Sequence, residues 1–132
     1  MILVDSNIFM YAAGVPHANK EPCSRLVMAV AGGSVEAAVD AEVLQEILHR
    51  YRAIGRQEQG LAIFDDVRRL AETVLPITAD VMDEARAILE RYPALDARDA
   101  VHAAVCKVNG IGEICSYDRG FDHVPGLRRR EP

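Results

Sequence analysis

The segment that decides the fold is MILVDSN, at residues 1–7. Met1–Val4 is a continuous apolar run, which is typical of a central strand of a parallel sheet because both faces of such a strand are buried. Asp5 follows this run directly, and a carboxylate at the mouth of a buried strand needs hydrogen-bonding partners, water or a metal ion to offset its loss of solvation. Ser6 and Asn7 place two more polar side chains at the same point. We therefore expect a functional site at Asp5, with a helix cap or a turn as the structural alternative.

Downstream of this segment, apolar strands alternate with helical segments. Short apolar runs predict strands at residues 35–39, 74–77 and 113–117, with an edge strand near Leu127. Apolar residues at helical spacing predict a helix over residues 21–31, one capped by Asp40 that continues to Ile54, one along Leu61–Leu70, one capped by Thr78 that ends at Tyr92, and a buried one over residues 99–109. This alternation predicts an α/β fold with a mainly parallel sheet, in which functional residues gather at the carboxyl ends of the strands.

Length and composition favour a single domain spanning residues 1–132. The apolar run at the start is too short for a signal peptide or a membrane span. Three cysteines without CxxC spacing fit a reduced, cytoplasmic protein. The net charge of −5 argues against a broadly basic surface for nucleic acids, but it does not exclude a nuclease because bound cations reverse the local sign.

Two further acids lie on predicted helices. Asp99 lies in the first turn of the last helix, where capping is the alternative role, but Asp96 lies one turn earlier and can cap instead. Glu46 borders the apolar stripe of its helix, whereas Glu42 lies farther from it. Glu46 is therefore the better candidate of the two, with a solvated surface position as its alternative.

The fourth candidate acid, Asp118, ends the predicted strand at residues 113–117. It lies in a segment whose composition also suits a turn, and the two roles are compatible. Asp122, four residues later, is a weaker candidate because a salt-bridging loop residue is the more usual role there.

The remaining motifs narrow the choice of cofactor. The histidines lack the paired spacing of a zinc site and no HExxH motif is present; they are His17, His49, His102 and His123. No GxxxxGK[ST] or GxGxxG loop is present, so we expect no nucleotide cofactor. A set of oxygen ligands instead suits a hard cation such as Mg²⁺ or Mn²⁺.

Taken together, four segments resemble the PIN domain, and within that family the VapC-type toxins of bacterial toxin–antitoxin pairs. The segments are the opening strand with Asp5-Ser6-Asn7, VLQEIL at residues 43–48, RDAVHAA at 98–104 and SYDRGFD at 116–122. Each is weak alone, but four in this order and at these spacings, covering nearly the whole chain, are specific. The resemblance implies an α/β/α sandwich with a short central sheet of four or five strands.

The resemblance also implies a function and a site. The catalytic and metal-binding acids of the family correspond to Asp5, Glu46, Asp99 and Asp118. Asp5 and Asp99 are the first choices as direct ligands of one or two Mg²⁺ or Mn²⁺ ions, which activate water for hydrolysis of an RNA phosphodiester. The supporting residues would be Ser6, Asn7 and Ser116. The candidate RNA contacts are Arg50, Arg52, Arg56 and Arg119, with ordinary surface charges as the alternative. A homodimer and a cognate antitoxin with a basic side chain in the acidic cleft are the expected partners.

One departure from the family pattern concerns the second metal position. Many relatives have an acid two residues after the fourth carboxylate, where this chain has Gly120, and Asp122 is the available substitute. Two alternatives remain beside the ribonuclease: a PIN scaffold that binds RNA or protein without catalysis, and an enzyme phosphorylated on Asp5. The latter lacks the second Asp of the haloacid-dehalogenase phosphatase pattern.

Overall fold

The computed structural model describes all 132 residues as six helices, one 3₁₀ helix and five strands. In chain order these are β1 (Ile2–Val4), α1 (Ser6–Ala13), α2 (Lys20–Ala31), β2 (Ala37–Asp40), α3 (Ala41–Ala53), α4 (Gln57–Leu70), β3 (Val74–Leu75), α5 (Ala79–Arg91), α6 (Ala97–Val108), β4 (Glu113–Cys115), the 3₁₀ helix η1 (Arg119–His123) and β5 (Arg128–Arg130). The predicted α/β class is confirmed. None of the helices combines the length and apolar composition that crossing a bilayer requires.

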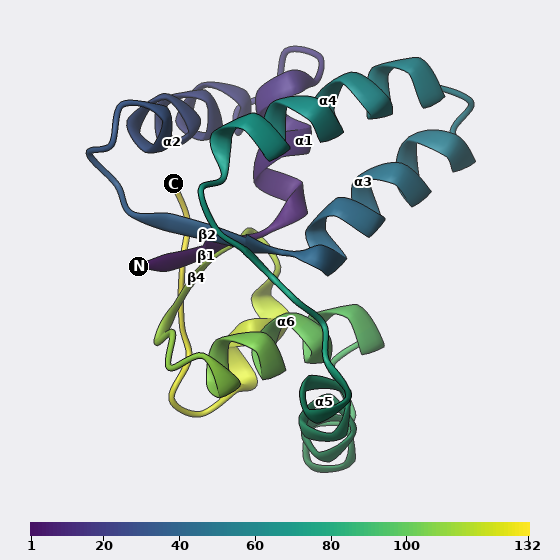
Figure 1. Cartoon of the computed structure of the whole chain (residues 1–132), viewed down its shortest axis with the longest axis vertical. Coiled ribbons are helices and arrows are strands. Elements are labelled where there is room, and N and C mark those ends of the chain that lie inside the picture. Colours follow the sequence, from purple (N-terminus) through teal and green to yellow (C-terminus); the bar gives the residue numbers. More distant parts are fainter.

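The sheet is parallel throughout, with the strand order β3-β2-β1-β4-β5. Helices α1 to α4 lie on one side of it, and α5 and α6 lie on the other (Figure 1). Strand β1 is central and pairs with β2 on one edge and with β4 on the other. After β1 the chain adds β2 and β3 on one edge of that strand, and it later adds β4 and β5 on the other edge. A crevice forms at the carboxyl ends of β1 and β4, because the order of the strands reverses between them.

The alternation of side chains along β1 explains the two cores. Ile2 and Val4 pack with α1 to α4, while Leu3 faces the opposite core formed with α5 and α6. All three are buried, which accounts for the unbroken apolar run at the start of the sequence. This strand therefore anchors Asp5 rigidly at the point where the two layers of helices meet the sheet edge.

Several predicted boundaries differ from the structure. The segment after Asp5 forms the helix α1, which is absent from the predicted elements, although a helix cap was the stated alternative role of Asp5. The fourth strand ends at Cys115 and not at residue 117, because the Asp118 backbone N–H donates to Ser116 Oγ and turns the chain. The edge position predicted for the proline-containing strand is confirmed, since β3 pairs only with β2.

The hairpin of α3 and α4 depends on a glycine. A Cβ atom at Gly60 would lie 2.4 Å from the Cβ of the buried Tyr51, so the helices approach too closely for any side chain there. We expect Gly60→Ala to lower the free energy of unfolding by about 2 kcal/mol, because overpacking outweighs the gain of about 1 kcal/mol in helix propensity. Urea denaturation measures this, with Glu58→Ala, an exposed position in the first turn of α4, as control. Equal or greater stability of Gly60→Ala would contradict the close packing.

Candidate active site

An acidic cleft of about 270 Å³ opens at the carboxyl ends of the central strands. The residues that line it come from α1, α3, α6 and the segments that follow β1 and β4; they are Asp5, Ser6, Asn7, Met10, Glu46, Arg50, Asp96, Arg98, Asp99 and Asp118. The four acids expected to form the site therefore line one cleft, although they lie up to 113 positions apart in the sequence.

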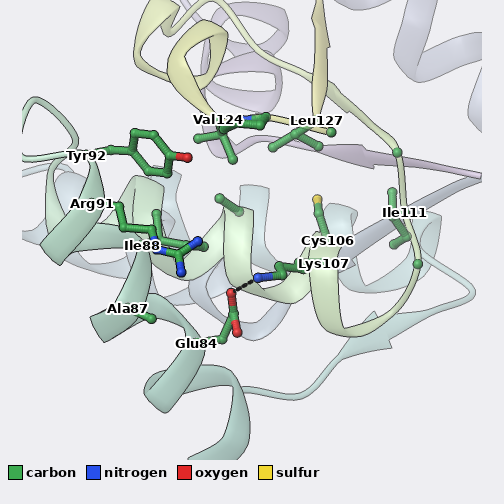
Figure 2. Close-up of a pocket in the computed structure, with 15 residues that line it drawn as sticks. Glu84, Ala87, Ile88, Arg91, Tyr92, Cys106, Lys107, Ile111, Val124 and Leu127 are labelled. Carbon is green, nitrogen blue, oxygen red and sulfur yellow. Dashed lines mark hydrogen bonds and ion pairs between the residues drawn. The ribbon is translucent and has the colours of Figure 1, made fainter.

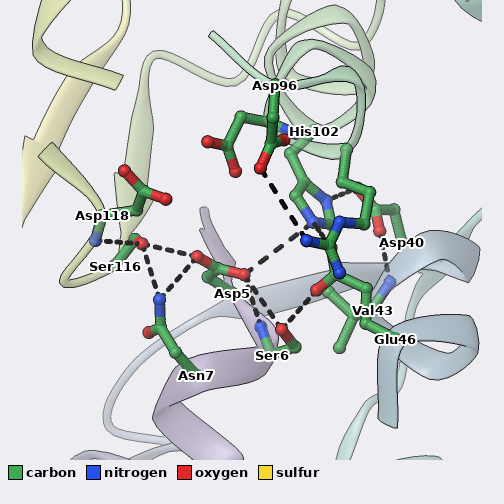
Figure 3. A network of polar contacts seen from close by, with 12 residues as sticks. Asp5, Ser6, Asn7, Asp40, Val43, Glu46, Asp96, His102, Ser116 and Asp118 are labelled. Carbon is green, nitrogen blue, oxygen red and sulfur yellow. Dashed lines mark hydrogen bonds and ion pairs between the residues drawn. The ribbon is translucent and has the colours of Figure 1, made fainter. Parts of the chain in front are cut away.

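Asp5 lies at the centre of this cleft and is 4% exposed. Its carboxylate accepts hydrogen bonds from the Ser6 backbone N–H at 2.6 Å, from Asn7 Nδ2 at 2.9 Å and from Ser116 Oγ (Figure 3). Burial raises its pKa, although the positive charge of His102 and these hydrogen bonds oppose the shift. Asp5 also caps α1, so the capping and site interpretations of this residue are compatible.

Glu46 projects from α3 toward Asp5 and is only 8% exposed. Ser6 Oγ donates to one of its oxygens, and His102 Nε2 lies 3.3 Å from the other. Burial raises the pKa of Glu46, but the hydrogen bonds and charge of His102, together with Ser6, outweigh burial and lower it. Glu46 therefore carries its charge in a nearly closed site, whereas Glu42 is not among the cleft residues.

Sequence reasoning missed the role of His102. This side chain on α6 is fully buried, and its Nδ1 donates to Asp40 Oδ2 at 2.7 Å while Nε2 faces Glu46 and lies 3.8 Å from Asp5 Oδ1. Burial lowers its pKa, but the hydrogen bonds to Asp40 and Glu46 and the negative charges of Asp40 and Asp5 raise the pKa well above the ordinary value. The imidazolium thus compensates for three buried carboxylates (Figure 3).

The sequence contains only a weak indication that His102 pairs with Asp40. Asp40 was predicted only as the cap of α3, which the structure confirms through its hydrogen bond to the Val43 N–H at 2.9 Å. A histidine within an otherwise apolar helix indicates a buried polar group that needs a partner. Nothing in the sequence identifies that partner, which lies 62 positions away.

Asp99 and Asp118 form the outer part of the cleft. Burial and the neighbouring charges of Asp118 and Asp96 raise the pKa of Asp99 to about 8. Asp96 caps α6 by accepting from the Asp99 N–H at 2.8 Å, as expected, and this leaves the Asp99 side chain free. Asp118 caps η1 and accepts from the Gly120 N–H at 2.8 Å.

The raised pKa of Asp99 predicts a stabilising substitution. Between the unfolded pKa near 3.8 and the folded pKa near 8, folding requires proton uptake, so wild-type stability falls as pH rises through this window. We expect Asp99→Asn to raise the free energy of unfolding of the metal-free protein by about 1 kcal/mol at pH 7, since partial exposure screens the effect. Urea titrations at pH 4 and pH 7 measure it. If Asp99→Asn raised the free energy of unfolding equally at pH 4 and pH 7, the raised pKa of Asp99 would not be the cause of the stabilisation.

The remaining predicted residues divide between the cleft and other places. Asn7 and Arg50 line the cleft. Ser116 is buried and bonded to Asp5, whereas Arg119 is not among the cleft residues. Asp122 does not line the cleft either: it pairs with Arg129 Nε at 2.9 Å, as expected of a loop residue.

Arg98 is a lining residue that sequence reasoning did not select. Its guanidinium lies 3.9 Å from Glu46 and 3.8 Å from Asp96, so it partly neutralises the mouth of the cleft. The signal was available, because Arg98 directly precedes the candidate acid Asp99 in the sequence.

A second cavity, of about 630 Å³, lies on the other side of the sheet between α5, α6 and the segment before β5. Its walls include the apolar side chains of Ile88, Val124 and Leu127, and its polar edge holds an ion pair between Lys107 and Glu84 (Figure 2). It has no group of carboxylates, so it offers none of the chemistry of the acidic cleft.

Comparison with known proteins identifies the family. The PIN domain model matches residues 2–127. The chain belongs to the PIN domain family. This PIN domain is 46% identical over 129 residues to ribonuclease VapC13 of Mycobacterium tuberculosis, covering 98% of both chains, and 34% identical over 118 residues to ribonuclease VapC23 of the same species, covering 89% of this chain and 93% of that one. The predicted resemblance to VapC toxins is confirmed.

Solved structures show the same fold. The PIN domain superposes on VapBC2 from Rickettsia felis with a TM-score of 0.75 at 18% identity, covering 99% of this chain and 98% of that one. It superposes on VapC20 of Mycobacterium tuberculosis with a TM-score of 0.72 at 21% identity, covering 89% and 90%. The α/β/α sandwich implied by the resemblance is therefore confirmed, and its sheet is five-stranded and parallel throughout.

Proposed function

We propose that the protein is a divalent-metal-dependent endoribonuclease, the toxin of a toxin–antitoxin pair, and that it hydrolyses RNA in the acidic cleft. The observation that carries this proposal is the convergence of Asp5, Glu46, Asp99 and Asp118 on one cleft at the sheet edge. Relatives that match nearly the whole chain are named VapC ribonucleases, which supports the same activity here. A cleft of four carboxylates without bound cations would repel a phosphodiester, so the activity requires cations.

The donor set of the cleft fits a hard cation. Its acids supply only oxygen ligands. Burial and the charges of Asp118 and Asp96 raise the pKa of Asp99 to about 8, and a bound cation would offset both effects. Asp5, Asp99 and Asp118 would hold one or two Mg²⁺ or Mn²⁺ ions, and Glu46 would complete the set directly or through water. When bound, such ions lower the pKa of a coordinated water and stabilise the negative charge that develops on the phosphate.

The chain's own residues fix the orientation of these ligands. Asn7 Nδ2 donates to both Asp5 Oδ2 and Ser116 Oγ, and Ser116 Oγ donates to the same carboxylate oxygen of Asp5. On the other side, His102 and Ser6 hold the two oxygens of Glu46. These contacts hold both carboxylates in place before substrate binds, so the site needs little reorganisation during the reaction.

We propose two protein partners as well. One solved structure with the same fold is DNA-bound VapBC from Salmonella typhimurium, and another is a toxin–antitoxin complex from Klebsiella pneumoniae. By analogy, a cognate antitoxin would cover this cleft and place a basic side chain among its carboxylates, where a buried charge finds partners. A homodimer is the proposed state of the free toxin.

Removal of metal tests the proposed activity. Protein stripped with EDTA is expected to cleave no RNA, and added Mg²⁺ or Mn²⁺ is expected to restore cleavage, since the empty cleft lacks the charge that stabilises the reacting phosphate. Gel electrophoresis of a structured RNA pool measures this. Undiminished cleavage in excess chelator would refute the metal dependence. No divalent-ion binding by calorimetry, together with no cleavage, would favour the silent scaffold.

A further inference from the structure

A hollow of about 560 Å³, lined by residues of α1, α3 and the start of α4, adjoins the acidic cleft. Asn7, Met10 and Arg50 line both the hollow and the cleft, so the two form one continuous depression. An RNA strand that places a phosphate in the acidic cleft therefore has space for its next nucleotide in this hollow, which we call the side hollow.

The side hollow contains an aromatic surface. Tyr11 of α1 and His17 of the following loop form a ring pair with centroids 4.9 Å apart and planes tilted by 35°. Tyr117, the residue before Asp118, packs edge-on against Tyr11 at 5.3 Å and supports it from the protein side. His17 is exposed and Tyr11 is half-buried, so the pair offers a ring face that is accessible yet held in place. Such faces stack unpaired bases of single-stranded nucleic acids.

Two arginines supply positive charge in the same place. Arg50 and Arg56 are exposed and line the side hollow, and neither forms an ion pair. In contrast, most of the other arginines of this chain, whose net charge is −5, are paired with acids. The buried Tyr51 lines the same hollow as these two arginines. The neighbouring Arg52 donates instead to Gln57 and does not line the side hollow.

We infer that the side hollow binds one unpaired nucleotide of single-stranded RNA next to the scissile phosphate. Its base stacks on Tyr11 and His17, and its phosphate contacts Arg50 and Arg56. This inference rests on the proposed ribonuclease function and specifies its substrate: a strand whose base can leave its stack, in a loop or a single-stranded region, and not the interior of a duplex.

Kinetics with a defined probe test this inference. On a fluorescent oligouridylate of about eight nucleotides, His17→Ala and Arg56→Ala are each expected to raise KM by about 10-fold, the lower part of the range for loss of a stacked base or a phosphate contact. Arg68→Ala is the matched control, because Arg68 is also exposed, forms no ion pair and lines none of the cavities described. Thermal unfolding of each variant shows whether these surface changes leave the fold intact.

Photocrosslinking locates the base directly. Asp5→Asn protein, which is expected to cut the probe about 1000-fold more slowly, is mixed in Mg²⁺ with 5-iodouridine oligomers, irradiated and digested with trypsin. The expected product is a crosslink to Tyr11 or His17, located by tandem mass spectrometry within the peptide of residues 1–20, which has no internal Lys or Arg. Crosslinks confined to other peptides would overturn the inference, as would an unchanged KM in both variants. If the variants lost affinity for the antitoxin but kept their affinity for RNA, the side hollow would be a binding site for the antitoxin, and this result would also overturn the inference.

The two proposals fail in different ways. If wild-type protein cleaves no RNA with Mg²⁺ or Mn²⁺, the proposed function fails, whatever the crosslinks show. If wild-type protein cleaves RNA but His17→Ala and Arg56→Ala behave as Arg68→Ala does, only the side-hollow inference fails.

Discussion

Replacement of Asp5 by Asn is expected to reduce the rate of RNA cleavage by about 1000-fold, which corresponds to about 4 kcal/mol of transition-state stabilisation. The physical reason is the loss of the central negative charge of the cleft, which is the charge that would hold the metal. The Asn amide has the same shape and can still cap α1, so the folded state should persist. The measurement is single-turnover cleavage of RNA in Mg²⁺ at pH 7.

The control for this prediction is Asp65→Asn. Asp65 is an exposed acid of α4 that forms no ion pair and does not line the cleft. Asp65→Asn changes the net charge of the protein by the same amount as Asp5→Asn does. Comparing the two variants therefore distinguishes loss of the metal ligand from a general change in electrostatic attraction to RNA. If Asp5→Asn cleaved RNA at a rate within a few-fold of the rate of Asp65→Asn, Asp5 would not be the central residue of the active site.

Replacement of His102 by Gln is expected to lower the free energy of unfolding by about 3 to 5 kcal/mol. The substitution leaves Asp40 fully buried and Glu46 nearly so, without the imidazolium that neutralises them. Urea denaturation at pH 6 measures the loss. His49→Gln, an exposed position on α3, is the matched control.

Two further results test the electrostatic cause. The double variant Asp40→Asn/His102→Gln should recover part of the loss, because it removes one of the buried carboxylates that have lost the imidazolium. Since the folded pKa of His102 is raised, its stabilising contribution is complete below the unfolded value near 6.5 and is lost as pH rises through the folded pKa. The gap between wild type and His102→Gln should therefore narrow in alkaline solution, and a gap that widens would contradict the charge assignment.

Local sequence patterns predicted those parts of the site that depend on strand ends and helix starts. Asp5 and Asp99 each adjoin an element with a strong apolar pattern, so their approximate place in the fold could be inferred from short segments. The contact of Asp40 with His102 could not, because it joins the end of β2 to α6 and no local pattern encodes the packing of these elements. The helix α1 had a detectable signal in Asp5 as its cap and in the buried pair Ile8 and Phe9.

The position of Gly120 shows where the family pattern and this chain differ. A Cβ atom there would lie 3.1 Å from Asp118 Oδ1 and 3.4 Å from Asp99 Oδ2, so the glycine allows these two carboxylates to approach the loop closely. A side chain at this position would require Asp118 Oδ1 and Leu95 Cδ2, which would lie 3.1 and 3.2 Å from its Cβ, to shift by a few tenths of an ångström. Asp122 is bound to Arg129 and is not a free substitute. The outer part of the cleft is therefore built from Asp99 and Asp118.

Anomalous diffraction from crystals of the protein soaked in Mn²⁺ shows whether the acidic cleft holds a divalent ion. We expect a Mn²⁺ peak at coordination distance, about 2.0 to 2.2 Å, from oxygens of Asp5 and of Asp99 or Asp118, and no peak at this position in Asp5→Asn crystals. A cleft without Mn²⁺ in crystals of protein that cleaves RNA with Mn²⁺ in solution, or a peak only at another surface, would contradict this expectation.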